Sequence, residues 1–185
     1  MLRFPFLRGY VSALTGLLLL AGPATAQIET EVSDVTGVER IESADMRSLS
    51  VEQYEGSHAS FRAAYVNDPD EGIAWEVSFY GFTDAATSVS ETNAFRVQAD
   101  GQSFEPTQLT SKTREVDGTM LEIKRAAFAR SAFEAIATAE TVTFSIGSAQ
   151  FTAPRARRSD LRRILDDAPA EPTPRTASTD SSGDR

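Results

Sequence analysis

His58 is the first residue to consider for catalysis, because it is the only histidine in this chain of 185 residues. A serine hydrolase needs a base beside its nucleophile, so a triad would have to combine His58 with Ser57, Ser60 or a distant serine and with a carboxylate. The chain has no Gly-x-Ser-x-Gly nucleophile elbow. We therefore interpret His58 as a solvent-facing loop residue, and a single histidine also excludes zinc sites built on several histidines.

A short acidic segment is the second candidate. Asp68, Asp70 and Glu71 precede Gly72, and carboxylates on a tight loop are ligands that calcium accepts. The segment is much shorter than the calcium loop of an EF-hand and lacks its closing glutamate. Pro69 and Gly72 are typical of a hairpin turn. We predict a turn here, so these three acids remain weak metal candidates, and we assign no cofactor and no catalytic residue.

The charge balance excludes some partners. Residues 27–153 contain 21 acidic and 9 basic side chains, and such a domain repels nucleic acid and anionic lipid at long range. We therefore expect no nucleic-acid partner. Acids are so abundant that no single pair indicates glycoside cleavage. A small hydrolase that uses His58 or a carboxylate pair stays the alternative to a binding role.

Five arginines reverse this charge locally. They are Arg155, Arg157, Arg158, Arg162 and Arg163, with Asp160 as the acid among them. A basic amphipathic helix can lie on an anionic lipid surface or contact an acidic partner. We favour a second interpretation, in which the arginines pair with the domain's own carboxylates and dock a closing helix.

The chain ends differ from the middle. Residues 1–26 combine Arg3 and Arg8, an apolar run and the small residues Ala24-Thr25-Ala26, which predicts a secretory signal peptide cleaved before Gln27. Without cysteine, the chain cannot carry a lipoprotein anchor or a disulfide. We expect an exported protein, periplasmic or extracellular, with no membrane-spanning segment after cleavage. Residues 27–167 should form one globular domain, and residues 168–185 a disordered tail.

The elements that must position these residues are mostly hairpins. Residues 142–146 and 149–153 alternate apolar and polar side chains around Gly147-Ser148, so Phe144 should lie opposite Phe151. Asp100-Gly101 should place Val97 opposite Phe104, and Asp117-Gly118 should join an exposed edge strand, 112–116, to strand 120–124. Residues 61–66 and 73–80 should form a third hairpin, and residues 39–43 and 47–53 are further strand candidates.

Two helices should close the domain. Ser131 and Glu134 have the spacing of a capping box at the start of a helix that ends near Glu140. Ser159 should cap a second helix whose apolar side chains are Leu161, Ile164 and Leu165. Seven or eight short strands with one or two short C-terminal helices predict an α+β fold, mainly an antiparallel sheet or sandwich.

The succession of an Asp-Gly hairpin, a helix ending in alanines, the Val-x-Phe-x-Ile-Gly strand and a Leu-Arg-Arg-Ile-Leu helix covers residues 95–167. This succession resembles C-terminal modules of uncharacterised exported bacterial proteins. The resemblance implies a bacterial source and no activity. We expect a non-enzymatic binding or structural module of the bacterial envelope or exterior, which contacts a protein or envelope component through a sheet edge or through the arginine-bearing helix. A third hypothesis is association of that helix with a membrane surface.

Overall fold

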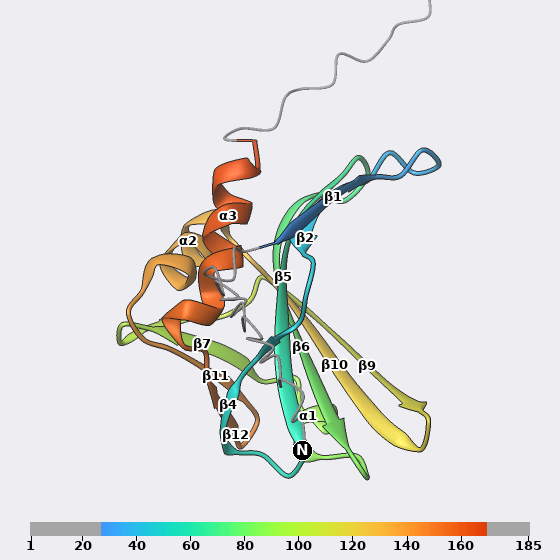
Figure 1. Cartoon of the computed structure of the whole chain (residues 1–185), viewed down its shortest axis with the longest axis vertical. Coiled ribbons are helices and arrows are strands. Elements are labelled where there is room, and N and C mark those ends of the chain that lie inside the picture. The colour runs from blue at the N-terminus through green and yellow to red at the C-terminus, as the bar shows by residue number, and fades with distance from the viewer. Residues whose placement is uncertain (1–26, 170–185) are drawn as a thin grey trace, which may run out of the picture.

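The computed structural model describes residues 27–169, which form two antiparallel sheets with helices packed beside them (Figure 1). The expected signal peptide, 1–26, and residues 170–185 of the expected tail lie outside the described residues. Ala168, where we expected the tail to begin, is buried after the last helix. Within residues 27–169, no helix is both long and apolar enough to span a lipid bilayer.

The larger sheet has the strand order β1-β2-β5-β6-β10-β9, with β3 beside β5. Its strands are β1 (Ile28–Val32), β2 (Glu39–Ser43), β3 (Arg47–Ser48), β5 (His58–Asp68), β6 (Gly72–Thr83), β9 (Gln108–Val116) and β10 (Thr119–Phe128). The smaller sheet has the order β4-β12-β11-β7-β8. Its strands are β4 (Ser50–Gln53), β7 (Phe95–Ala99), β8 (Gln102–Phe104), β11 (Val142–Ile146) and β12 (Ala149–Thr152).

The helical segments are α1 (Ser88–Glu91), α2 (Arg130–Thr138), a 3-10 turn η1 (Arg155–Arg158) and α3 (Ser159–Asp167). The prediction of an α+β, mainly antiparallel fold with short C-terminal helices is confirmed. The described part has more strands than the seven or eight we expected, and β1 and α1 were not anticipated. In Figure 1, α2 and α3 lie toward one end of the sheets and α1 toward the other.

Aromatic side chains fill the space between the two sheets. Phe61 of the larger sheet and Phe144 of the smaller one have ring centroids 6.0 Å apart, and those of Phe79 and Phe151 are 4.8 Å apart. All four rings are at most 2% exposed. Burying such rings provides the largest favourable contribution to folding in a chain that has no disulfide. Trp75, which we predicted to be in the core, is 4% exposed.

The predicted hairpin registers are confirmed. Phe144 lies opposite Phe151 and Val97 opposite Phe104. Asp100 and Asp117 have φ angles of 48° and 52°, the left-handed conformation that the two-residue Asp-Gly turns require. The expected exposed edge is also present, since β9 has a neighbour on one side only and eight of its nine side chains are exposed.

Both predicted helix caps are wrong. The N-cap of α2 is Ala129, whose carbonyl accepts from the N–H groups of Ala132 and Phe133 at 3.0 and 3.1 Å. Ser131 therefore already lies inside the first turn. Ser159 is likewise the first residue of α3 and not its cap. The 3-10 turn η1 runs directly into α3, so the backbone at Ser159 is already helical.

Strand β10 turns an unexpected face toward the core. Leu121 and Ile123 share a face, as predicted, but it is the outer face of the sheet. Ala126 and Phe128 point inward, and in a strand without a bulge the same parity continues along its whole length. Glu122 and Lys124 therefore face the core, where they are 0% and 1% exposed.

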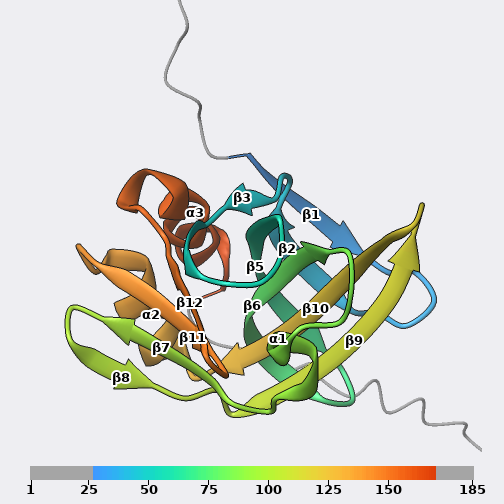
Figure 2. The ribbon, with the colours of Figure 1, turned by 90° about the horizontal axis from the view of Figure 1, so that it is seen from below.

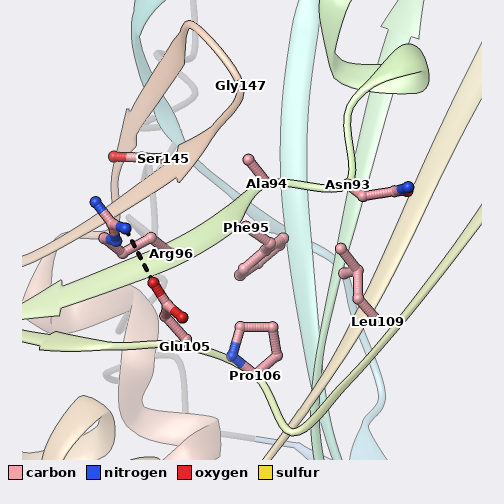
Figure 3. Close-up of a pocket in the computed structure, with 9 residues that line it drawn as sticks. All are labelled: Asn93, Ala94, Phe95, Arg96, Glu105, Pro106, Leu109, Ser145 and Gly147. Carbon is pink, nitrogen blue, oxygen red and sulfur yellow. Dashed lines mark hydrogen bonds and ion pairs between the residues drawn. The ribbon is translucent and has the colours of Figure 1, made fainter.

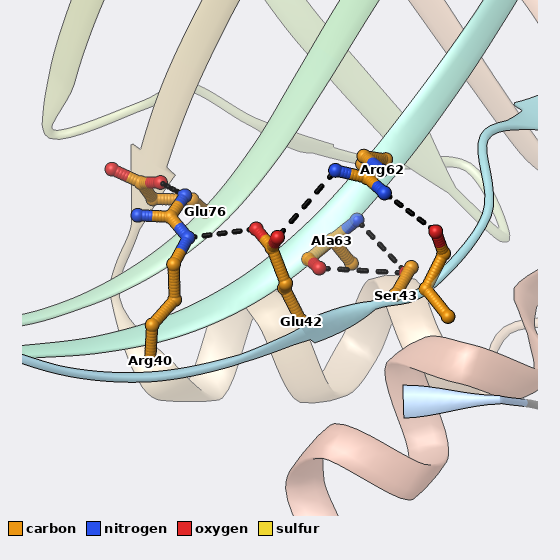
Figure 4. A network of polar contacts seen from close by, with 7 residues as sticks. Arg40, Glu42, Ser43, Arg62, Ala63 and Glu76 are labelled. Atoms are coloured by element: carbon orange, nitrogen blue, oxygen red, sulfur yellow. Dashed lines mark hydrogen bonds and ion pairs between the residues drawn. The ribbon is translucent and has the colours of Figure 1, made fainter. Parts of the chain in front are cut away.

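The outer face of the larger sheet carries a network of ion pairs near β2 (Figure 4). Arg40 donates to Glu42 at 2.7 Å and to Glu76 at 2.9 Å, and Arg62 lies 3.5 Å from Glu42. The four side chains come from β2, β5 and β6, so the network ties three neighbouring strands together. All four are partly buried, which makes the network stronger than isolated surface pairs.

The chain crosses from the larger to the smaller sheet between β3 and β4. Leu49 alone separates these strands; its N–H donates to the carbonyl of Ala59 at 2.9 Å and its side chain is buried. Beside the crossing, Arg47 forms a two-bond ion pair with the fully buried Asp160 of α3 at 2.6 and 3.0 Å. Val51 of β4 pairs with Phe151 of β12.

Asp100 connects the β7–β8 turn to the segment between α2 and β11. Its carboxylate accepts from the N–H of Thr141 at 2.8 Å and from the N–H of Glu140 at 3.0 Å. These bonds lower the pKa of Asp100 below its ordinary value of 3.8. A carboxyl whose pKa is lower in the folded state stabilises the fold above that ordinary value, and the contribution is lost as the pH falls through the folded pKa.

We predict that Asp100→Asn lowers stability at neutral pH and that the difference from the wild type shrinks as the solution is acidified. Asparagine tolerates the positive φ of this position, so the change removes the charge and leaves the turn geometry. Urea unfolding of both proteins at several pH values checks this. A difference that stays constant down to the most acidic condition would contradict it.

Candidate functional site

Arg158, one of the five arginines expected to contact a partner or membrane, lies inside the protein. Its guanidinium donates to the carbonyls of Ile136, Ala139 and Glu140 at 2.8 to 3.0 Å, and its Nε donates to Ala153 at 3.0 Å. The side chain is 0% exposed, and burial lowers its pKa below the ordinary value of an arginine. The cation satisfies carbonyls at the C-terminal end of α2 that no helical bond can reach.

The other four arginines are divided between internal and external positions. Arg162 donates to the carbonyl of Ala137 at 3.0 Å, again at the end of α2. Arg155 pairs with Glu140, and Arg163 lies 4.0 Å from Asp167, one turn along the helix. Arg157 is exposed. Docking of α3 on α2 therefore occupies Arg158 and Arg162, which are not available to an external partner.

His58 is exposed at the start of β5, with its ring 6.0 Å from that of Phe82. Ser57 donates to the carbonyl of Phe82 at 3.0 Å, and Ser60 is buried with its hydroxyl 3.5 Å from the sulfur of Met46. Within residues 27–169, no hydrogen bond joins His58 to a serine or to a carboxylate. The described residues therefore hold no assembled triad around His58.

The acidic turn between β5 and β6 uses its own carboxylate. Asp68 Oδ1 accepts from the N–H groups of Asp70 and Glu71 at 2.8 and 3.1 Å, which closes the turn as aspartate commonly does. No group of three or more acidic or histidine side chains with the spacing of a metal site occurs between Gln27 and Pro169. Asp68, Asp70 and Glu71 therefore act as a turn and do not converge on one point.

Glu122 and Lys124 form a buried polar cluster that the sequence did not indicate. Glu122 accepts from the backbone N–H of Thr87 at 2.8 Å and from the hydroxyl of Tyr54 at 2.9 Å. Lys124 donates to the carbonyls of Ser90 and Thr92. The carboxylate therefore holds the N-terminal end of α1 and the ammonium holds its C-terminal end, each with the charge that this end of a helix favours.

The surroundings show that this cluster is structural. Burial lowers the pKa of Lys124, and burial together with Glu122 raises the pKa of Tyr54 well above its ordinary 10.0, so the phenol stays a hydrogen-bond donor. The Tyr54 ring lies where a side chain on Gly81 would be, so glycine is needed at that position of β6. Every polar atom of the cluster has a partner inside the protein, and α1 packs over it.

Two shallow hollows adjoin strand β9, one on each face of the sheet. The first, of about 340 Å³, lies between β9 and β7 (Figure 3), and its lining includes Phe95, Pro106 and Leu109 with the 2.9 Å Arg96–Glu105 pair at its rim. The second, of about 280 Å³, is lined by Thr110, Ser111, Lys112, Ile123 and Arg125. Both have mixed polar and apolar walls, which suit side chains of a peptide better than a small polar substrate.

The outer face of β9 and β10 carries three cations. Lys112, Arg114 and Arg125 are exposed, and the register places them on one face, on which these two strands bear no acid. None of the three has a hydrogen bond or ion pair within residues 27–169. Every other basic side chain between Gln27 and Ala153 has a partner: Arg40, Arg47, Arg62, Arg96, Lys124 and Arg130.

The three cations of β9 and β10 therefore form a second candidate site in addition to the C-terminal arginines, of which Arg155, Arg157 and Arg163 are still exposed. The sequence predicted that β9 is an exposed edge. It did not predict a basic site there, because Lys112 and Arg114 alternate with serine and threonine. An alternation of cations on one strand face, in a domain with 21 acids against 9 bases over residues 27–153, is the signal that could have identified it.

Comparisons of the chain with protein-family models, with curated proteins and with solved structures give no match. The resemblance of residues 95–167 to exported bacterial modules stays a prediction. Function is therefore inferred from the residues themselves.

We predict that Arg158→Ala lowers the free energy of unfolding by more than about 3 kcal/mol, because it leaves buried carbonyls without a donor and opens a cavity. Arg163→Ala, on the exposed side of α3, should change it by less than about 0.5 kcal/mol. Urea unfolding of both variants measures this. Equal effects would show that Arg158 is not the anchor of α3.

Proposed function

We propose that this protein is an exported, non-enzymatic binding module that takes up an extended acidic segment of a partner protein as an additional strand on β9. The observation that carries the proposal is the combination of an open nine-residue edge strand with three unpaired cations on one face. Export to the periplasm or exterior rests on the signal-peptide pattern of residues 1–26.

Strand β9 has the geometry that strand addition needs. It pairs with β10 over nine consecutive residues with no register shift, and it contains no proline. The other edge strands are shorter: β1, β4, β8 and β3 have five, four, three and two residues. An edge of this length offers a row of free backbone N–H and C=O groups to an incoming strand.

The two hollows supply contacts for the side chains of that strand. Successive side chains of an added strand point to opposite faces of the sheet. Those on the core side would reach the hollow beside Leu109, and those on the outer side would lie next to Lys112 and Arg114. Alternating acidic residues on the outer side therefore match the cations, and this pattern defines the preferred ligand.

The backbone phase of β9 identifies the residues to change. Val116 and Thr119 flank a two-residue turn and so form a hydrogen-bonded pair with each other. Pairs alternate along an antiparallel ladder, so the N–H groups of Thr113 and Glu115 point away from β10, toward an added strand.

Thr113→Pro should therefore weaken binding by about tenfold or more, because it removes one ladder donor at the centre of the edge. The probe is a fluorescein-labelled peptide of alternating glutamate and threonine, and fluorescence anisotropy measures its binding to the chain that begins at Gln27. Thr113→Val keeps the N–H and is the matched control, with binding close to that of the wild type.

A peptide with lysine in place of glutamate should not bind. Unchanged affinity of Thr113→Pro, or equal binding of the two peptides, would overturn the proposal. Circular dichroism and urea unfolding of each variant separate a lost ligand site from a lost fold.

A further inference from the structure

The edge of the larger sheet opposite β9 is its chemical complement. Strand β1 has a neighbour only on the β2 side, and four of its five side chains are exposed. Glu29 and Glu31 lie on the outer face, because they pair with Glu42 and Arg40. The same sheet thus presents two carboxylates, two residues apart, on one edge and two cations, Lys112 and Arg114, with the same spacing on the other.

Strand direction also matches. Every neighbouring pair along β1-β2-β5-β6-β10-β9 is antiparallel, so β1 and β9 run in opposite directions within one molecule. A second copy placed beside the first in the same orientation therefore brings its β1 antiparallel to β9, with both outer faces on the same side. The larger sheet would then continue from one copy into the next.

The backbone groups fit the same arrangement. Ser33 donates to the carbonyl of Val38 at 2.9 Å and Ala44 donates to Gln27, so odd-numbered residues of β1 bond to β2 and Thr30 points its N–H and C=O outward. Thr113 does so on β9. Placing Thr30 opposite Thr113 puts Glu29 opposite Arg114 and Glu31 opposite Lys112. Charge pairing and backbone pairing thus require one register.

We infer that the strand received by β9 is β1 of a second copy of this chain, so that the protein assembles head to tail through a continuous antiparallel sheet. This inference rests on the proposed function of β9. Pairing of two β9 edges would oppose cations to cations, and pairing of two β1 edges would oppose carboxylates to carboxylates, so the charges select the unlike pair. In such a head-to-tail contact each pair of copies still has one free β1 edge and one free β9 edge. Further copies can therefore add, which leads to rings or filaments.

Charge reversal on each edge tests the inference by sedimentation velocity. One variant carries Lys112→Glu and Arg114→Glu, and the other carries Glu29→Lys and Glu31→Lys. The wild type should form larger species as its concentration rises, and each variant alone should associate about tenfold or more weakly, because two attractive pairs become repulsive. An equimolar mixture of the two variants should assemble again, since every contact then joins an acidic to a basic edge.

Cross-linking tests the register, because the natural chain has no cysteine. A chain with Thr30→Cys and Thr113→Cys should give a ladder of disulfide-linked multimers on mild oxidation, since directly opposite residues of paired strands lie within disulfide reach. A chain with Thr30→Cys and Ser103→Cys, the second site on the edge strand β8 of the smaller sheet, should give no such ladder.

A wild type that stays monomeric at all concentrations, or a mixture that does not restore assembly, would overturn the inference. If the acidic peptide still bound β9 in that case, the proposed function would stand with another protein as partner. Binding of an acidic oligosaccharide that competes with the peptide would assign the cations to a glycan instead, and would overturn both.

Discussion

The layer of phenylalanine rings between the two sheets is the constraint on which the rest of the fold depends. Phe61 and Phe79 meet Phe144 and Phe151 across this layer, and the chain has no disulfide to hold the sheets together. Because both sheets are open, the layer would be exposed to water at its two ends. Helical segments cover both ends, with α2 and α3 at one and α1 at the other in Figure 1. The view from below shows α1 beside β9 and β10, apart from α2 and α3 (Figure 2).

Each cover is fastened by buried charge on backbone groups. Arg158 binds carbonyls at the end of α2, and Glu122 and Lys124 bind the two ends of α1. A buried ion costs several kcal/mol unless its hydrogen-bonding capacity is satisfied, and here backbone groups that would themselves be unsatisfied provide the partners. The same side chains are thereby withdrawn from the surface, where Lys112, Arg114 and Arg125 of β9 and β10 remain exposed.

The sequence predicted what local chemistry determines. The Gly147-Ser148 turn and the alternation around it defined the register that places Phe144 opposite Phe151, and the polar composition of β9 predicted an edge. Arg158 could not be identified because it stands in a run of arginines of which Arg155 and Arg157 are exposed, and only the end of α2, which is distant in the chain, explains its burial. The inward face of β10 could not be predicted either. Leu121 and Ile123 are the apolar pair of this strand, but the register puts Ala126 and Phe128 on the inner face and therefore Leu121 and Ile123 on the outer one.

The passage of the chain between the sheets at Leu49 affects the order in which the protein can fold. Strand β4 is synthesised early, yet its neighbour β12 comes about 100 residues later, as the Glu52–Thr152 contact shows. In a nascent chain β4 stays unpaired until β12 has been synthesised. Arg47 likewise has no ion-pair partner until Asp160 has been synthesised. The two sheets therefore pack together late and in a nearly all-or-none step. This step is slow, because the paired strands are far apart in the sequence. Truncation before β12 would leave β4 without its partner strand, and truncation before α3 would leave Arg47 without Asp160.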